Sequence, residues 1–189
     1  MSIAKQKTAK PKTALLVIDM LEDFINGPLG NERSRALVPQ VKALADRLRA
    51  EGIPVIHCTD RHIKGIDKEL ELWGEHAMEG TRGAEIVAGL LKDGDRVVPK
   101  RRYSGFFQTD LDLLLRELGA DTVILCGLYT NMCVRHTAAD AYMLGYNIIL
   151  ASEATCSMTD EEYESGMEYF KTCYAAAICT NDEITKQKI

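Results

Sequence analysis

The chain has 189 residues, of which 46% are hydrophobic, and its formal net charge is −5 at pH 7. A chain of this length buries one sizeable core, so we expect a single domain at 13–189 after a flexible N-terminal tail at 1–12. The acidic balance lacks the basic patch that binds phosphate backbones, which argues against a nucleic-acid partner. No apolar stretch approaches the roughly 20 residues that cross a bilayer, so no membrane span is expected.

The six cysteines are another guide to the class of protein. They show neither paired Cys-x-x-Cys spacing nor a preceding signal sequence, so we expect free thiols rather than a disulfide framework. The lysine-rich start of the chain has no apolar signal core either. The predicted location is therefore the reducing cytoplasm.

Apolar runs of strand length alternate with amphipathic segments along the chain. Strands are expected at 14–19, 54–59, 96–100, 122–128, 147–151 and 175–179, and their continuously apolar interiors are typical of parallel strands covered on both faces. Helices are expected at 39–50, with Pro39 in the first turn, and at 84–91, 110–118, 131–144 and 160–172. The alternation predicts an α/β fold with a doubly wound, mainly parallel six-stranded sheet and helices on both faces.

Polar residues mark the ends of four predicted strands. Asp19 ends the first strand, Asp60 follows the second and Lys100 ends the third, while Cys133 follows the fourth by one short turn. The ligand crevice of a doubly wound sheet lies at these strand ends. A thiol at a helix N-terminus is expected to have a lowered pKa, and its thiolate is a competent nucleophile. A nearby carboxylate can move its proton while an ammonium stabilises the charges.

The same residues allow other interpretations. Asp19 and Lys100 are also consistent with an ordinary ion pair, and Cys133 with an inert buried thiol. A Cys–His mechanism would pair Cys133 with His136, one helical turn later, although His136 projects from deeper in the helix. His57 lies inside an apolar strand, where a core histidine with a satisfied hydrogen bond is expected.

A second polar cluster follows the second strand. Asp60 and His62 stand two residues apart in an extended segment and project to the same side, where they can chelate one ion. His76, from the following loop, can complete a face of two histidines and one carboxylate. Loop histidines that make ordinary hydrogen bonds are the alternative. These ligand types suit zinc, iron or manganese without choosing among them.

Three ordered segments carry a resemblance to a known family. They are residues 15–24 (LLVIDMLEDF), 100–111 (KRRYSGFFQTDL) and 126–134 (CGLYTNMCV). The chain resembles the isochorismatase-like cysteine hydrolases over about 13–180, a family that includes nicotinamidases and N-carbamoylsarcosine amidases. The resemblance implies the α/β fold of that family and an enzyme that hydrolyses carbon–nitrogen bonds other than peptide bonds.

The resemblance also assigns roles to individual residues. Asp19 is implied as the general base, Lys100 as its electrostatic partner and Cys133 as the nucleophile. A cis peptide is implied at Leu128-Tyr129, with the backbone N–H groups of Tyr129 and Cys133 as the oxyanion hole. Members that cleave a vinyl ether lack the cysteine, so its presence points to cleavage of an amide through a thioester.

The implied ligands follow from the same comparison. Nicotinamidases hold zinc or a similar ion through Asp-x-His and a later His, so a divalent metal, zinc first, is expected on Asp60, His62 and His76, with no organic cofactor. Phe24 and Trp73 are candidate walls for a flat substrate. Nicotinamide is the first expected substrate. N-carbamoyl amides are the second, because segments 73–81 and 100–104 look more like those of carbamoyl-amide hydrolases.

Two further expectations concern partners and class. The resemblance implies a homo-oligomer, a dimer or a tetramer, that acts on a small-molecule amide. The rival hypothesis is a non-hydrolytic module of the same fold, which binds a metal or partner through the histidine loop and uses the thiol as a redox group. Release of ammonia from an amide distinguishes the two.

Overall fold

A six-stranded parallel sheet forms the centre of the computed structural model, which describes residues 12–186. Its strands are β1 (Lys12–Ile18), β2 (Val55–Asp60), β3 (Arg96–Lys100), β4 (Ala120–Leu128), β5 (Asn147–Cys156) and β6 (Ala177–Cys179). They lie in the order β3-β2-β1-β4-β5-β6, and all neighbours pair in parallel. The strand order reverses between β1 and β4, which places the ligand crevice at their carboxyl ends. The predicted fold class is confirmed. The tail expected at 1–12 lies outside the described residues except for Lys12, which begins β1.

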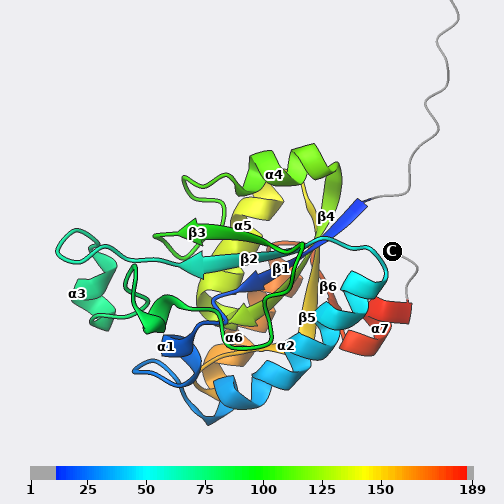
Figure 1. Cartoon of the computed structure of the whole chain (residues 1–189). Coiled ribbons are helices and arrows are strands. Elements are labelled where there is room, and N and C mark those ends of the chain that lie inside the picture. Colours follow the sequence, from blue (N-terminus) through cyan, green and yellow to red (C-terminus); the bar gives the residue numbers. More distant parts are fainter. Residues whose placement is uncertain (1–11, 187–189) are drawn as a thin grey trace, which may run out of the picture.

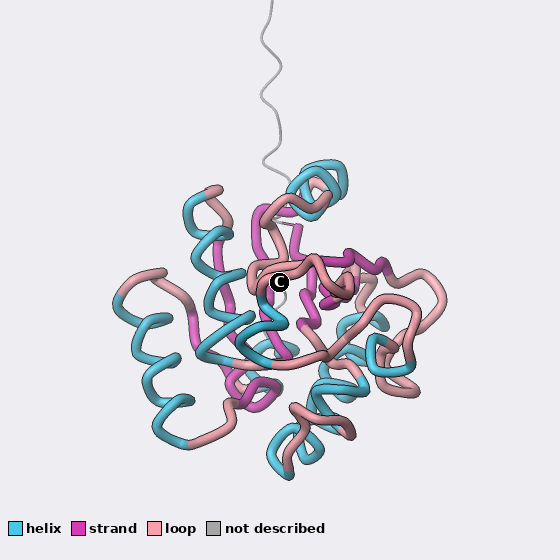
Figure 2. Tube along the Cα trace, turned by 90° about the vertical axis from the view of Figure 1, so that its left-hand side faces the viewer, coloured by secondary structure: helices cyan, strands magenta, loops and turns pink. Residues whose placement is uncertain are grey.

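Helices cover both faces of this sheet. They are α1 (Glu22–Ile25), α2 (Glu32–Ala50), α3 (Glu69–Trp73), α4 (Leu111–Leu118), α5 (Arg135–Met143), α6 (Asp160–Thr172) and α7 (Asn181–Lys186), with a 3-10 turn η1 (Arg82–Ala84) and a π-helical turn η2 (Thr130–Val134). Figure 1 shows α2 and α7 on one side of the sheet and α4 and α5 on the other. Figure 2 shows the strands enclosed by the helices. None of the described helices is both long and apolar enough to cross a membrane.

Alternation along β1 divides the core between the two faces. Leu15 and Val17 pack in the cluster on the α2 side, while Leu16 and Ile18 pack in the cluster that contains residues of α4, α5 and α6. All four side chains are buried. Because successive residues of a strand point to opposite faces, a strand covered on both faces is apolar throughout. This explains why the continuous apolar runs predicted the sheet correctly.

The helix expected at 39–50 begins earlier than predicted. The Asn31 side chain accepts a hydrogen bond from the Ser34 N–H at 3.0 Å, and the Ser34 hydroxyl accepts from the Asn31 N–H at 2.9 Å. This capping box starts α2 at Glu32. The expectation that Pro39 lies in the first turn is therefore wrong, because Pro39 lies inside the helix.

The helix expected at 84–91 is also wrong. The backbone of this segment instead forms hydrogen bonds with residues in and just before α1. The Glu22 N–H donates to Glu85 O at 2.9 Å, and the Val87 N–H donates to Met20 O at 3.0 Å. The apolar residues that suggested a helical period are nevertheless buried, at positions Ala84, Val87 and Leu90. Their spacing therefore reflects which side chains of a loop are buried, and these residues form no α-helix.

The remaining expected helices agree more closely with the structure. α6 spans the predicted residues and starts with a capping box between Thr159 and Glu162. α4 ends at Gly119, whose φ of 68° is left-handed, as the glycine stop signal predicted. The helix expected at 131–144 divides into η2 and α5. α1, α3 and α7 were not predicted, because helices this short carry little periodicity.

Candidate functional site

The ends of β1, β3 and β4 bring Asp19, Lys100 and Cys133 into contact. Lys100 Nζ lies 2.7 Å from Asp19 Oδ2 and 3.6 Å from Cys133 Sγ. A carboxylate oxygen of Asp19 lies within 4.8 Å of the Cys133 sulfur. The three residues are buried, with exposed fractions of 0% for Asp19, 1% for Lys100 and 6% for Cys133. One ammonium thus contacts both a carboxylate and a thiol, away from bulk water.

The backbone at the end of β1 sets the direction of the Asp19 carboxylate. Asp19 has a φ of 51°, in the left-handed region that residues other than glycine seldom adopt. Its carboxylate Oδ1 accepts a hydrogen bond from the Asp60 N–H at 2.8 Å, and its own N–H donates to Cys58 O at 2.9 Å. Such a conformation persists where neighbouring contacts enforce it, and these are often at functional sites.

The turn between β4 and α5 holds Cys133 in place. The Thr130 and Thr155 hydroxyl oxygens lie 2.8 Å apart, and the Thr155 hydroxyl donates to Gly127 O at 2.9 Å. Gly127 has a φ of 105°, and a Cβ there would lie 2.0 Å from Ile18 O, so the position requires glycine. The cis peptide expected at Leu128-Tyr129 is present just before this turn. The assignment of the Tyr129 and Cys133 N–H groups to an oxyanion hole stays a prediction.

The protonation states follow from burial and the single ammonium. Burial raises the pKa of the Cys133 thiol, and Asp19 and Asp60 add to this effect against the opposing charge of Lys100. Burial and the neighbouring Asp60 raise the pKa of Asp19 to about 6, although Lys100 opposes them. Burial opposes the charge on Lys100, but Asp19 and Asp60 outweigh it and raise the Lys100 pKa.

These environments correct the expectation for the thiol. The position of Cys133 at a helix N-terminus predicted a lowered pKa for its thiol. The structure instead buries the side chain within a π-helical turn and places two carboxylates near the sulfur. The thiol therefore rests in the protonated form, and a base must take its proton when it reacts.

Asp60, His62 and His76 form a second cluster beside the first, and Glu69 joins it. Donor atoms of the four residues all lie within 4.8 Å of one another. His62 Nε2 is 3.7 Å from Asp60 Oδ2 and 3.4 Å from Glu69 Oε2. The sequence reasoning missed Glu69, because it lies on α3, midway along the loop between the two histidines, with no regular spacing to either.

The histidine hydrogen bonds favour metal binding by this cluster. His76 Nδ1 lies 2.9 Å from Gly74 O, and His62 Nδ1 lies 3.3 Å from Asp67 Oδ2. Both acceptors favour a proton on Nδ1, which leaves the Nε2 lone pair free for an ion. His62 Nε2 and Glu69 Oε2 are buried without a hydrogen-bond partner, a costly arrangement unless something binds there. Two imidazoles and two carboxylates therefore fit zinc, iron or manganese.

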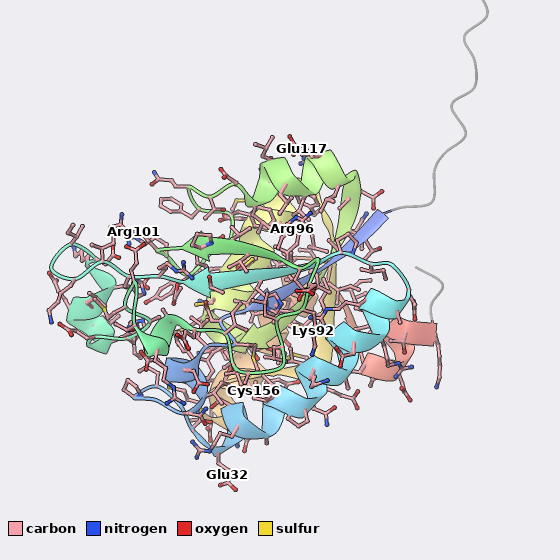
Figure 3. All side chains as sticks on the ribbon, in the orientation of Figure 1. Glu32, Lys92, Arg96, Arg101, Glu117 and Cys156 are labelled. Atoms are coloured by element: carbon pink, nitrogen blue, oxygen red, sulfur yellow. The ribbon has the colours of Figure 1, made fainter. Side chains whose placement is uncertain are left out.

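Asp67 supports this cluster from behind. Its Oδ1 accepts from Arg101 Nε at 2.8 Å, and its Oδ2 accepts from the Ile63 N–H at 2.7 Å. Burial favours the neutral acid, but these hydrogen bonds outweigh it and hold the pKa of Asp67 well below its usual range. Arg101, labelled in Figure 3, follows β3 on the side of the molecule where α3 lies. Asp67 is thus an ionised partner that fixes the orientation of the His62 ring.

A small cavity lies between the two clusters. Its volume is about 20 Å³. The expected Phe24 and Trp73 both line it, and their role as substrate walls stays a prediction. The lining also includes residues that the sequence reasoning did not select, namely Leu29, Tyr103, Met132 and Met158, together with Tyr129, Cys133 and three members of the second cluster, Asp60, Glu69 and His76.

The two other histidines have different surroundings. His136 Nδ1 lies 2.8 Å from Met132 O, and the ring packs 5.2 Å from the Tyr103 ring, along a surface depression outside the Cys133 cavity. The geometry therefore favours Asp19 over His136 as the base beside the thiol. His57 is buried with Nε2 3.1 Å from Asp95 Oδ2, which confirms the expected core histidine.

The chain is similar in sequence and structure to several known proteins. The isochorismatase domain model matches residues 13–182. N-carbamoylsarcosine amidase from Thermoplasma acidophilum is 38% identical with a TM-score of 0.85, over 90% of this chain and 97% of that chain. Nicotinamidase PncA from Bacillus subtilis is 32% identical with a TM-score of 0.84, over 89% and 99%. Pyrazinamidase of Pyrococcus horikoshii, in complex with zinc, is 29% identical with a TM-score of 0.83, over 90% and 99%. The family resemblance predicted from the three segments is confirmed.

Proposed function

The chain belongs to the isochorismatase family and is a hydrolase, and we propose that it is a cysteine amidohydrolase that cleaves a C–N bond in a small molecule. One observation carries the proposal: Lys100 Nζ contacts both the Asp19 carboxylate and the Cys133 sulfur, and all three side chains are buried. A nucleophile, a base and a cation in contact are the parts that amide cleavage through a thioester requires. Similarity to an N-carbamoylsarcosine amidase and a nicotinamidase adds support.

The resting protonation states define the first half of the reaction. The Cys133 thiol gives its proton to Asp19 as Sγ attacks the amide carbonyl carbon, and the carbonyl oxygen becomes an oxyanion. The N–H groups of Tyr129 and Cys133 stabilise that charge in this proposal. When the intermediate collapses, the C–N bond breaks and Asp19 returns the proton to the leaving nitrogen. Ammonia or an amine departs, and a thioester on Cys133 remains.

Water completes the second half. Asp19 removes a proton from the water that attacks the thioester carbonyl, and the C–S bond then breaks as the thiol recovers the proton. The product is a carboxylic acid. Lys100 stays charged throughout and stabilises the ionised forms of both Asp19 and Cys133, which burial alone would disfavour.

A divalent metal held by Asp60, His62 and His76 would, when bound, accept a lone pair from a nitrogen or oxygen of the substrate. The free Nε2 of His62 supports this part of the proposal. Phe24 and Trp73, on the walls of the same cavity, would enclose a flat substrate. Nicotinamide is the first candidate, supported by the similarity to a nicotinamidase and to a pyrazinamidase that was solved with zinc.

An N-carbamoyl amide is the second candidate substrate. The specific observation in its favour is the 38% identity with N-carbamoylsarcosine amidase, over 97% of that chain. Chelation separates the two candidates. A pyridine nitrogen that ligates the metal makes turnover sensitive to chelator, whereas a carbamoyl group held by hydrogen bonds does not depend on the ion.

The test is ammonia release from nicotinamide and from a panel of N-carbamoyl amides, with and without chelator. We expect turnover of at least one compound by the wild-type protein and none by Cys133→Ala. Asp19→Asn keeps the shape of the side chain but removes the base, so its turnover should fall by on the order of 10²-fold or more. An Asp19→Asn variant with full activity, beside an inactive His136→Ala, would replace this mechanism with the Cys–His alternative. Absence of turnover on the whole panel would favour the non-hydrolytic module.

A further inference from the structure

The cavity beside Cys133 is small for an amide substrate. Its volume of about 20 Å³ has room for about one water. Ligand pockets for small organic molecules are typically about 300–1,000 Å³. Cys133 is only 6% exposed, so little of its side chain is accessible in this conformation. We therefore expect part of the cavity wall to move when a substrate approaches the sulfur.

Helix α3 is a part of the wall that has few buried contacts. None of its residues from Glu69 to Trp73 is buried, although Glu69 and Trp73 both line the cavity. Figure 1 shows α3 at the edge of the molecule, set apart from the helices that cover the sheet. Segments with few buried contacts open at low free-energy cost. The segment 68–74, which is α3 with its two capping residues, is thus the candidate for movement.

Two side chains connect this segment to the site. Trp73 Nε1 donates a hydrogen bond to the Tyr103 hydroxyl at 2.9 Å, across the cavity. Glu69 turns inward, with its side chain 9% exposed and Oε2 3.4 Å from His62 Nε2. One connection is a single hydrogen bond between neutral groups, whose net contribution to stability is modest. The other has no hydrogen-bond partner, since Glu69 Oε2 is buried and unsatisfied.

Firm anchors flank the segment on both sides. Asp67 is held by Arg101 and by the Ile63 N–H, and His76 is held by Gly74 O. Gly74, the residue after α3, has a φ of 75° and no atom within 4 Å of the position of a Cβ. A glycine with this freedom can absorb a backbone rotation. Rotation about the N–Cα bond of Gly74 would move α3 but leave the Gly74 carbonyl that bonds His76 in place, so α3 can move without displacing His62 or His76.

We propose that residues 68–74 are a lid over Cys133, and that a divalent metal on Asp60, His62 and His76 closes the lid by recruiting Glu69 as a fourth ligand. The Trp73–Tyr103 hydrogen bond is the latch on the other side of the cavity. This inference rests on the metal site of the proposed function. The donor atom of Glu69 already faces the free Nε2 of His62, and a bound cation supplies the partner that the buried carboxylate lacks. Metal content thereby controls access to the thiol.

Trp73 provides a direct readout, because it is the single tryptophan of the chain. The experiment adds Zn²⁺ to metal-free protein and follows Trp73 fluorescence together with hydrogen exchange of the amides of 68–74. The variants are Glu69→Gln and, as a matched control on the same helix, Glu71→Gln, whose side chain is exposed. Zinc content is measured by elemental analysis in every sample, and ammonia release is assayed separately.

We expect one Zn²⁺ to shift the Trp73 emission and to slow exchange of 68–74 in the wild type and in Glu71→Gln. Glu69→Gln should bind zinc about tenfold or more weakly and, once saturated, should show neither response. Tyr103→Phe should bind zinc normally but exchange faster at Trp73. A Glu69→Gln variant whose lid responds like the wild type overturns the lid coupling while leaving the metal site intact. A protein that binds no zinc overturns both, and the ammonia assay then decides whether the cysteine mechanism stands.

Discussion

Lys100 Nζ donates a hydrogen bond to Asp60 Oδ1 at 2.6 Å, so the ammonium that contacts the thiol is also bound to a carboxylate of the histidine cluster. Burial raises the pKa of Asp60, but Lys100 and His62 outweigh it, and the net pKa is lowered. One buried cation therefore stabilises an ionised carboxylate in each cluster. The two clusters are electrostatically coupled, so a substitution of Lys100 should affect the charge balance of both.

The first prediction follows from this shared charge. Lys100→Met removes the ammonium and leaves Asp19 and Asp60 as buried carboxylates without their cation. Removal of one partner of a buried ion pair typically costs about 3–5 kcal/mol, so the free energy of unfolding in urea should fall by that order. Lys171→Met, on the exposed surface of α6, should change it little. Equal stability of the two variants would contradict the coupling.

A second prediction concerns thiol reactivity in the free protein. Cys133 is buried and its pKa is raised, whereas Cys173 is exposed. Because the thiolate is the reacting form and must be reached by the reagent, iodoacetamide should label Cys173 faster than Cys133. Mass spectrometry of the labelled peptides over time measures both rates. If Cys133 is labelled first, then the closed, protonated state described here is not the dominant state in solution.

Some of this site was visible in the sequence, for a physical reason. Asp19, Asp60 and Lys100 stand at ends of apolar runs, and the carboxyl ends of parallel strands meet at one edge of the sheet. Strand ends and topology therefore predict contact between residues that are distant along the chain. Asp60 and His62 were found as a pair because an extended segment points alternate residues to the same side.

Other features of the site have no local signal. Glu69 lies beside His62 because of the course of an irregular loop. The hydrogen bond between Trp73 and Tyr103 likewise depends on how two such segments are placed. The raised pKa of Cys133 depends on burial by residues of several elements, which a helix-start pattern does not report. The apolar spacing at 84–91 likewise predicted a helix. The segment is instead a loop whose backbone hydrogen-bonds to residues in and next to α1. Apolar periodicity therefore predicts which residues are buried more reliably than it predicts their secondary structure.

A third prediction tests how the nucleophile turn is positioned. Gly166 of α6 packs on that turn, and a Cβ there would lie 3.1 Å from both the Cα and the N of Asn131. The turn has little freedom to yield, because Ser157 donates to Asn131 Oδ1 at 2.8 Å and Thr130 bonds with Thr155. Gly166→Ala should therefore displace the turn and lower kcat by about tenfold or more, since displacements near 1 Å can cost 10²-fold.

The control for this variant lies one position earlier. Ser165→Ala raises helix propensity at an exposed position of α6, so its kcat should match the wild type. Urea unfolding of both variants separates displacement of the turn from loss of stability. Unchanged kcat in Gly166→Ala would mean that the turn tolerates the shift and that α6 has no positioning role.

The last prediction concerns the pH dependence of stability and uses a cluster remote from Cys133. Burial lowers the pKa of His57, and it outweighs the hydrogen bond and charge of Asp95, which act in the opposite direction. Arg49 faces the same carboxylate, with Nη2 2.7 Å from Asp95 Oδ2, and it also disfavours a charged imidazole. His57 thus stays neutral in the folded state at a pH where the unfolded chain, with a pKa near 6.5, already takes up a proton.

The sign follows from the proton count. Below about pH 6.5 the unfolded state binds more protons at this position than the folded state, so the stability contributed by neutral His57 is complete above that pH and is lost as the pH falls. His57→Asn cannot titrate, so its free energy of unfolding should fall less steeply than that of the wild type between about pH 7 and pH 5. Urea unfolding at a series of pH values measures the two slopes, and His136→Asn serves as the histidine control outside this cluster. Parallel curves for wild type and His57→Asn would show that His57 is protonated equally in the folded and unfolded states, which its burial against Arg49 and Asp95 opposes.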